Sequence, residues 1–336
     1  MWKLLALVKR KLVWFVAGSM LLGLINGYFF PSSYLKPFII PLTILMVYPM
    51  MVSMDLTAIF RSCSYRLQVF CQGINFIIIP LVAFGLGRVF FPDDPYMAFG
   101  LLLMGLLPTS GMTISWTGFA KGDTKVAVKM TIIGLIAGIL LTPFYGYILM
   151  GKMISIPLLK VMRQIALVIV IPLALGALTQ IVLRRLFGRL RFERDIKPPF
   201  PQISLLGVVG IIFVAMSLKA QTIISDPLTL VRLAIPLLIL YAINYAVATY
   251  AGRALFPRKE GIALVFGTAM RNLSVALAIA VTVFGEQGAQ MAMIISLAYI
   301  IQIKSAALYV KHVDRLFKET DRTPTGGISP AATSDE

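Results

Sequence analysis

Histidine, cysteine and acidic side chains are scarce in this sequence. Its 336 residues include one histidine, His312, two cysteines, Cys63 and Cys71, and 14 aspartates and glutamates in total. Two cysteines are too few for a disulfide framework or a cysteine-based metal centre. The apolar segments hold no aspartate pair, no histidine and no serine–histidine arrangement of the kind that catalysis uses. We therefore expect no bound metal, no cofactor and no enzyme activity.

Charged residues of either sign make up only 13% of the chain, whereas hydrophobic residues make up 59%. Soluble domains average about 25% charged and about 45–50% apolar residues. Together with a mean hydropathy of +0.88, this composition predicts a polytopic membrane protein whose main surroundings are the lipid bilayer. The formal net charge is +17, but the basic residues lie in short runs between apolar segments, as in cytoplasmic loops. Nucleic-acid binding is therefore not expected.

Ten apolar segments are long enough to cross a bilayer, which takes about 20 helical residues. They are residues 13–30, 37–54, 68–91, 97–119, 126–150, 164–186, 201–218, 228–254, 262–284 and 288–310. The first lacks a small-residue cleavage pattern, so we expect a membrane span and not a signal peptide. Lysine and arginine are about threefold more frequent on the loops that share a side with the N-terminus, which predicts a plasma-membrane protein with both termini in the cytoplasm.

The ten segments divide into two sets of five within a single transmembrane domain, residues 1–319. The two repeats would cover about 12–152 and 160–312, and an odd number of spans in each repeat gives them opposite topology. Gly122-Asp123 precedes the fifth segment and Gly285-Glu286 the tenth, which is a weak internal likeness. The tail, residues 320–336, is rich in Pro, Gly, Ser and Thr and is predicted to be disordered.

Arg271 lies near the middle of the ninth segment, inside the interruption Gly267-Thr268-Ala269-Met270-Arg271-Asn272. An arginine at the bilayer centre costs at least ~2.5–3.5 kcal/mol, so it normally faces a protein or water-lined interior. Two interpretations stay open. Arg271 is a functional group, or it is a structural arginine that pairs with helix-end carbonyls.

The fourth segment carries a second interruption, at Pro108. The proline removes one backbone donor and frees carbonyls that must find other partners. The hydroxyls of Thr109, Ser110 and Thr113 either repair this kink or bind a ligand. Interrupted helices at corresponding places in two inverted halves are the best sequence sign of a binding site at the membrane midplane.

Further polar groups lie at membrane depth. Asn75, five residues before Pro80, and Asn244 either line the same cavity or tie helices together. Lys304 lies about two turns from the end of the tenth segment, and Asp55 ends the second segment on the same side. Lys304 therefore either extends to the membrane surface or pairs with Asp55.

These segments resemble the bile acid:sodium symporter family, within the superfamily of bile acid, arsenite and riboflavin transporters. The likeness covers nearly all ten segments. It is strongest at residues 108–123, which end in Phe119-Ala120-Lys121-Gly122-Asp123, and at residues 267–280. The resemblance implies an all-α polytopic membrane protein with ten transmembrane helices in two inverted five-helix repeats. It also implies a panel domain and a core domain, with the fourth and ninth helices unwound where they cross.

The chain departs from the family at the ion sites. Sodium-coupled members read like Glu-Val-Gly-Met-Gln-Asn in the ninth span, so Gly267 stands for the ion-binding carboxylate and Arg271 for the glutamine. In the fourth span the family's Ser-Asn pair falls on Thr113 and Ile114. A guanidinium would repel sodium strongly at low dielectric. The comparison therefore implies a protein without the usual sodium sites.

The resemblance to the arsenite branch is different. Trp116 and the turn after it are similar, but the cysteine of that branch falls at about Thr109 and its glutamate at about Ser274. Arsenic ligation would then need a mechanism other than that thiol.

The residues and the resemblance together predict a secondary transporter that moves a small anionic organic solute by alternating access. Arg271 would neutralise the solute or act as a built-in cation in place of sodium. The residues expected to line the pocket are Arg271, Asn272, Thr268, Thr109, Ser110, Thr113 and Asn75. Two alternatives remain: efflux of arsenite or another metalloid, and a passive channel or non-transporting receptor on the same scaffold. The solute, the coupling ion, the direction and the oligomeric state stay open.

Overall fold

The computed structural model of the protein describes residues 11–53, 64–151, 162–163, 166–226 and 228–317, and the regular elements in these ranges are helices. Asp55 and the predicted tail, residues 320–336, lie outside the described residues. The elements in chain order are α2 (Leu12–Phe29), η1 (Ser32–Phe38), α3 (Ile39–Val52), α4 (Tyr65–Gly73), η3 (Ile74–Ile78), α5 (Ile79–Phe90), α6 (Pro95–Leu106), α7 (Gly111–Phe119), α8 (Thr124–Met150), η4 (Ala166–Val170), α10 (Ile171–Phe187), α11 (Arg189–Arg191), η5 (Phe192–Ile196), α12 (Phe200–Leu218), α13 (Ala220–Ser225), α14 (Leu228–Leu255), α15 (Arg258–Ala269), α16 (Leu273–Val283) and α17 (Gly285–Leu316).

Each of the ten predicted apolar segments is mainly helical over its described residues. Seven helical stretches in the described part are long and apolar enough to cross a membrane, and α6 and α16 are shorter apolar helices. The fourth predicted segment is split between α6 and α7, and the ninth between α15 and α16. The chain is therefore a multi-pass membrane protein in which two helices are interrupted.

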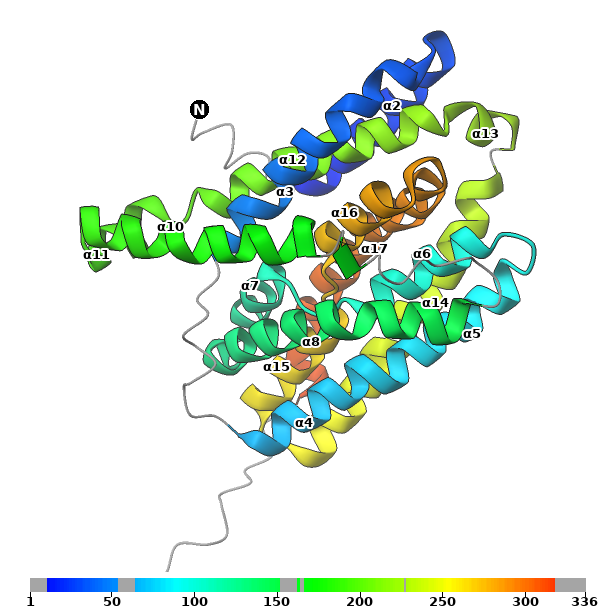
Figure 1. Cartoon of the computed structure of the whole chain (residues 1–336). Helices are drawn as coiled ribbons and strands as arrows, with labels where there is room; N and C mark the ends of the chain where they lie inside the picture. Colours follow the sequence, from blue (N-terminus) through cyan, green and yellow to red (C-terminus); the bar gives the residue numbers. More distant parts are fainter. Residues whose placement is uncertain (1–10, 54–63, 152–161, 164–165, 227, 318–336) are drawn as a thin grey trace, which may run out of the picture.

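The helices form two groups (Figure 1). One group, the four-helix layer, comprises α2, α3, α10 and α12. In this layer α12 packs against α2 and α3, and α10 packs against α3. The main bundle comprises α4 to α8 and α14 to α17. Helix α17 contacts α6, α14 and α16 within the bundle and also α2 and α12 of the layer, so it lies where the two groups meet.

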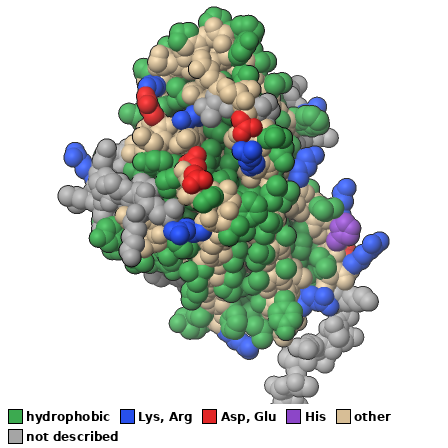
Figure 2. All heavy atoms as spheres, turned by 90° about the vertical axis from the view of Figure 1, so that its right-hand side faces the viewer, with side chains coloured by type: hydrophobic (Ala, Val, Ile, Leu, Met, Phe, Trp, Pro, Cys, Tyr) green, Lys and Arg blue, Asp and Glu red, His purple; other side chains and the backbone are tan. Residues whose placement is uncertain are grey.

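Polar side chains inside the four-helix layer are bonded to neighbouring helices. Ser19 donates a hydrogen bond to the Val209 carbonyl at 2.6 Å, and Gln180 donates to the Val52 carbonyl at 2.7 Å. Such bonds satisfy side chains that have no water partner inside a bilayer. Outward-facing positions are apolar instead, and hydrophobic side chains cover a broad area of the face in Figure 2. Lipid is the surrounding that suits such a surface.

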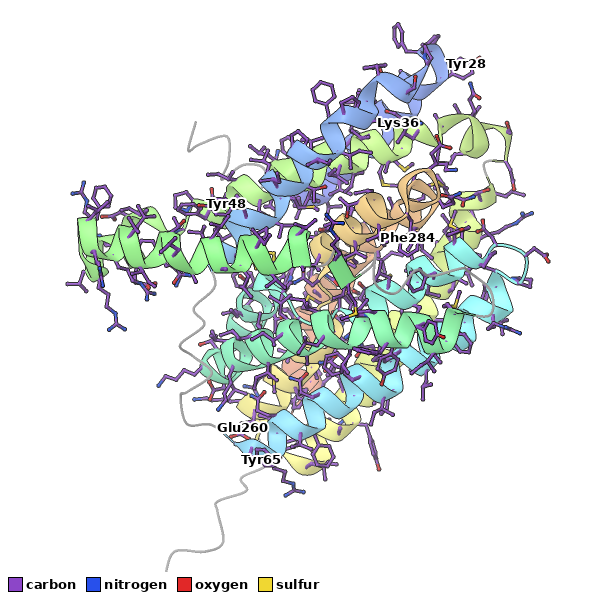
Figure 3. The ribbon with its side chains drawn as sticks, viewed as in Figure 1. Tyr28, Lys36, Tyr48, Tyr65, Glu260 and Phe284 are labelled. Carbon is purple, nitrogen blue, oxygen red and sulfur yellow. The ribbon has the colours of Figure 1, made fainter. Side chains whose placement is uncertain are left out.

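One end of the contact between the two groups is joined by an ion pair. Lys36, in η1 after α2, lies 2.5 Å from a carboxylate oxygen of Glu286, at the start of α17. Figure 3 shows Lys36 and Phe284 toward this end, and Glu260 and Tyr65 at the opposite end of the main bundle. The four-helix layer and the main bundle are therefore tied together at one end.

Candidate functional site

The break between α6 and α7 is built by Pro108 and its neighbours. A residue before proline avoids the helical region, and Leu107 accordingly has φ −110° and ψ 80°. Thr109 has φ +60°, a left-handed conformation that is unusual for a β-branched residue. Its hydroxyl donates to the Thr131 carbonyl at 3.1 Å. Helix α8 can come this close because Gly134 has no side chain; a Cβ there would lie 2.8 Å from the Thr109 hydroxyl oxygen.

Side chains cap the half-helices that follow the two breaks. The Ser110 hydroxyl accepts from the Met112 N–H, and the Ser110 N–H donates to the Thr113 hydroxyl at 3.1 Å, which makes a capping box for α7. Asn272 caps α16, since its Oδ1 accepts from the Val275 N–H at 3.2 Å. Each predicted interruption is thus a helix end followed by a new helix start.

The two breaks lie against each other. The Thr109 N–H donates to the Met270 carbonyl at 2.7 Å, and the Asn272 N–H donates to the Leu107 carbonyl at 2.8 Å. Between them, Pro108 and Arg271 form an antiparallel β-bridge. Backbone groups freed in one helix are therefore satisfied by the other helix.

Arg271 fills the space between the ends of α6 and α15. Its side chain is almost fully buried, at 2% exposure. Its Nε donates to the Met104 carbonyl at 3.3 Å, and its Nη2 donates to the Gly105 carbonyl. Its Nη1 donates to Asn75 Oδ1 at 2.6 Å and to the Thr268 carbonyl at 2.9 Å. Four of the five guanidinium hydrogens are thus engaged.

Three of these acceptors are carbonyls in the last turns of α6 and α15. The last carbonyls of a helix lack partners within it and carry the partial negative charge of the helix dipole. The Arg271 guanidinium therefore acts as a resident cation between two helix C-termini. These contacts are those of the structural interpretation of Arg271.

Two further side chains, Gln302 and Tyr241, form hydrogen bonds at the break beside Arg271. Neither was predicted as a site residue from the sequence. Gln302 accepts from the Arg271 N–H at 2.8 Å and donates to the Arg271 carbonyl at 3.3 Å. The Tyr241 hydroxyl donates to the same Gln302 oxygen at 2.8 Å. A lone glutamine in the apolar run 300–303 was the signal that was available. Asn244, noted from the sequence, donates to the Thr268 carbonyl at 2.9 Å.

All seven predicted pocket residues are buried at or beside the two breaks. Several are engaged with backbone: Asn75 donates to the Gly267 carbonyl at 3.0 Å, and the Thr268 hydroxyl donates to the Val265 carbonyl at 3.1 Å. Of the seven, Ser110 and Arg271 line the neighbouring cavity. The Asn272 Nδ2 is buried and has no hydrogen-bond partner among the described residues.

The cavity next to the breaks has a volume of about 540 Å³ and lies between the four-helix layer and the main bundle. The layer contributes Leu12, Met50, Ser53, Pro201 and Leu205, and the bundle contributes Ser110, Gly111, Trp116, Arg271, Leu273, Ser274, Tyr299, Gln302 and Lys304. Its wall includes the first residues of α7 and α16, whose helix N-termini carry partial positive charge. No aspartate or glutamate is among the described residues that line it.

Two interrupted helices that meet beside a cavity, inside a multi-pass membrane protein, are the architecture of a membrane transporter. The chain belongs to the Sodium Bile acid symporter family, whose sequence model matches residues 39–226. The family is the one that the sequence resemblance indicated.

Curated relatives of the chain include two proteins named for arsenical resistance. The arsenical-resistance protein Acr3 of Corynebacterium glutamicum is 24% identical over 228 residues, which cover 65% of this chain and 62% of that protein. The protein of the same name from Alkaliphilus metalliredigens is 26% identical over 267 residues, covering 75% and 74%. A Bacillus subtilis protein described as an uncharacterized sodium-dependent transporter, YocS, is 23% identical over 210 residues, covering 61% and 62%.

Replacing Arg271 with methionine is expected to destabilise the protein. The change takes a donor away from Asn75 and from the helix-end carbonyls, and each buried acceptor left unsatisfied costs about 1–3 kcal/mol. The apparent melting temperature of the purified protein should fall by several degrees, and Arg271→Lys should recover part of the loss. Lys311→Met, on the exposed part of α17, is the matched control and should change little. An Arg271→Met variant as stable as the parent would contradict the role of resident cation.

Proposed function

We propose that this protein is a secondary transporter that moves a small anionic organic solute across the plasma membrane by alternating access, without the usual sodium sites. The observation that carries the proposal is the Arg271 guanidinium. It lies between two helix C-termini beside a cavity whose described lining contains basic residues and no carboxylate. A fixed positive charge there takes the place of a bound cation.

The predicted pocket residues then have two kinds of role. Ser110 and Arg271 face the cavity. The Asn272 amide lies behind the cavity wall, and its Nδ2 has no hydrogen-bond partner among the described residues. Asn75, Thr109, Thr113 and Thr268 shape the breaks through their bonds to backbone. A solute anion is favoured near the starts of α7 and α16, where half-helix N-termini attract negative charge.

The two ends of the interface between the layer and the bundle support alternating access. On α17, Glu286 pairs with Lys36, whereas Lys304 and Ala307 line the cavity. Eighteen residues separate Glu286 from Lys304, a helical rise of about 27 Å. If ten spans form two inverted repeats with both termini in the cytoplasm, the cavity belongs to the cytoplasmic side and the ion pair closes the outer side.

A ligand screen and a counterflow assay test the function. Purified protein is heated with carboxylates, sulfonates, inorganic oxyanions and arsenite, each in sodium and in N-methylglucamine buffer. We expect an organic anion to raise the melting temperature, because a ligand that binds the folded state stabilises it by mass action. The same anion should then show saturable, gradient-driven counterflow in proteoliposomes.

Other outcomes of these assays separate the alternatives. Transport of arsenite with no response to organic anions would support metalloid efflux, the candidate that the names of the two arsenical-resistance relatives favour. Non-saturable flux down a gradient would indicate a channel. Binding without any flux would indicate a receptor.

The built-in cation predicts a change in sodium dependence. Wild-type protein should melt at the same temperature in sodium and in N-methylglucamine, since the guanidinium already occupies the oxygen-lined space. Arg271→Gln leaves the Met104, Gly105 and Thr268 carbonyls and Asn75 Oδ1 facing that space, so sodium should raise its melting temperature by a few degrees. Arg271→Met, which refills the space with an apolar side chain, should not respond. Sodium stabilisation of the wild type would contradict this role.

The Lys36–Glu286 pair predicts a gate that charge reversal opens. Ala289 lies beside Glu286 and is 2% exposed, so a cysteine there, with Cys63→Ser, should react slowly with a membrane-impermeant maleimide. Lys36→Glu or Glu286→Lys should speed labelling by up to about fivefold, since exposed ion pairs contribute at most about 1 kcal/mol. The double reversal should restore slow labelling. Asp93→Lys, an exposed acid in the loop before α6, is the control for charge alone. Equal labelling rates in all variants would contradict the proposed gate.

A further inference from the structure

Three basic residues, Lys11, Arg271 and Lys304, line the cavity, and they differ in how many hydrogen bonds their charged groups already form. Arg271 is bonded to four acceptors, which leaves one hydrogen on Nη2. Lys11 comes directly before α2, at the end of a membrane span where basic residues are common. Lys304 is exposed and makes no hydrogen bond or ion pair among the described residues. Neither lysine has a partner among the described residues, and Lys304 is the one that lies inside a predicted span.

The depth of Lys304 makes this free charge unusual. It lies six residues before the end of the tenth predicted segment at residue 310, which is about 9 Å of helix. A lysine about two turns inside a span needs either water at the membrane surface or an opposite charge. The described lining of the cavity supplies no carboxylate. An anion that enters the cavity would supply the missing charge.

We infer that Lys304 is the residue that recognises the charged group of the solute, and that this group carries one negative charge, as a carboxylate or sulfonate does. The inference rests on the proposed function and assigns the recognition to a residue other than Arg271. The ammonium of Lys304 carries one positive charge, which suits one negative charge on the solute. Lysine also suits the task because its charge is compact and its stem is flexible, so the ammonium can follow the solute.

The other residues of the cavity wall would contact the remainder of such a solute. The backbone at Ser110 and Gly111 begins α7 and offers the positive end of a helix dipole to the same anion. Trp116, Leu205 and Ile303 provide apolar surface for an uncharged body. The charged group is thus placed between Lys304 and the start of α7, while the resident cation stays with the two helix C-termini.

The test compares anions with neutral analogues of the same shape. Probes of four to ten carbons are used in pairs, each carboxylate with its amide and each sulfonate with its sulfonamide, for example 4-phenylbutanoate with 4-phenylbutanamide. Binding to purified full-length protein is followed by tryptophan fluorescence, since Trp14 and Trp116 both line the cavity. Wild-type protein should bind at least one anion ~10-fold more tightly than its neutral partner, a difference of about 1.4 kcal/mol.

Three variants isolate the role of Lys304. Lys304→Met should abolish the preference for the anion and leave affinity for the neutral partner unchanged, whereas Lys304→Arg should keep the preference. Lys311→Met removes an equal charge further along α17, outside the cavity lining, and should keep it too. Melting curves without probe establish that Lys304→Met is folded, and a misfolded methionine variant is replaced by Lys304→Gln.

The outcomes distinguish this inference from the proposed function. If Lys304→Met retains the full preference of the wild type, Lys304 is not the recognising group, and an anion transporter still stands. If Lys311→Met loses the preference equally, the effect belongs to overall charge and the inference is overturned. If wild-type protein prefers no anion over its neutral partner, the proposed anionic solute fails and the inference fails with it.

Discussion

A helix that stops inside a bilayer leaves backbone groups that water cannot satisfy, and this constraint organises the centre of the protein. In this protein, the backbone groups freed at each of the two helix breaks form hydrogen bonds with the other break. The Thr109 N–H finds the Met270 carbonyl, and the Asn272 N–H finds the Leu107 carbonyl. The remaining carbonyls at the ends of α6 and α15 turn to Arg271, Asn75 and Asn244. Neither break is satisfied by its own helix alone.

The same geometry places the negative and positive ends of the helix dipoles on different sides of the two breaks. The C-terminal ends of α6 and α15 face the buried guanidinium, whereas the N-terminal ends of α7 and α16 reach the cavity wall. Partial negative charge is thus neutralised inside the protein, and partial positive charge is presented where a ligand can arrive. A cation that is part of the chain need not be bound and released, which distinguishes this arrangement from one in which a mobile ion completes the site.

Much of the fold was predictable because apolar length and proline are local signals. The ten apolar segments are mainly helical, and one interruption occurs at Pro108 as expected. The other occurs at 270–272, within the predicted interruption 267–272, because α15 continues to Ala269. The partners of Arg271 were not predictable. Met104 and Gly105 contribute carbonyls, which every residue has, and Gln302 is one polar side chain in an apolar run. Thr109, Thr113 and Thr268 were assigned to a pocket, but spacing could not show that their hydroxyls bond to backbone or cap a helix.

The hydrogen bond between Thr109 and Met270 has a consequence for how the chain is made. Its two residues are 161 positions apart in the sequence. At ribosomal rates of about 5–20 residues per second, Met270 is therefore synthesised about 8–32 s after Thr109. During that interval the half-helices α6 and α7 are in or near the membrane without the strand-like pairing that completes them. The nascent first half therefore depends on the insertion machinery, on lipid headgroups or on trapped water until the second half emerges.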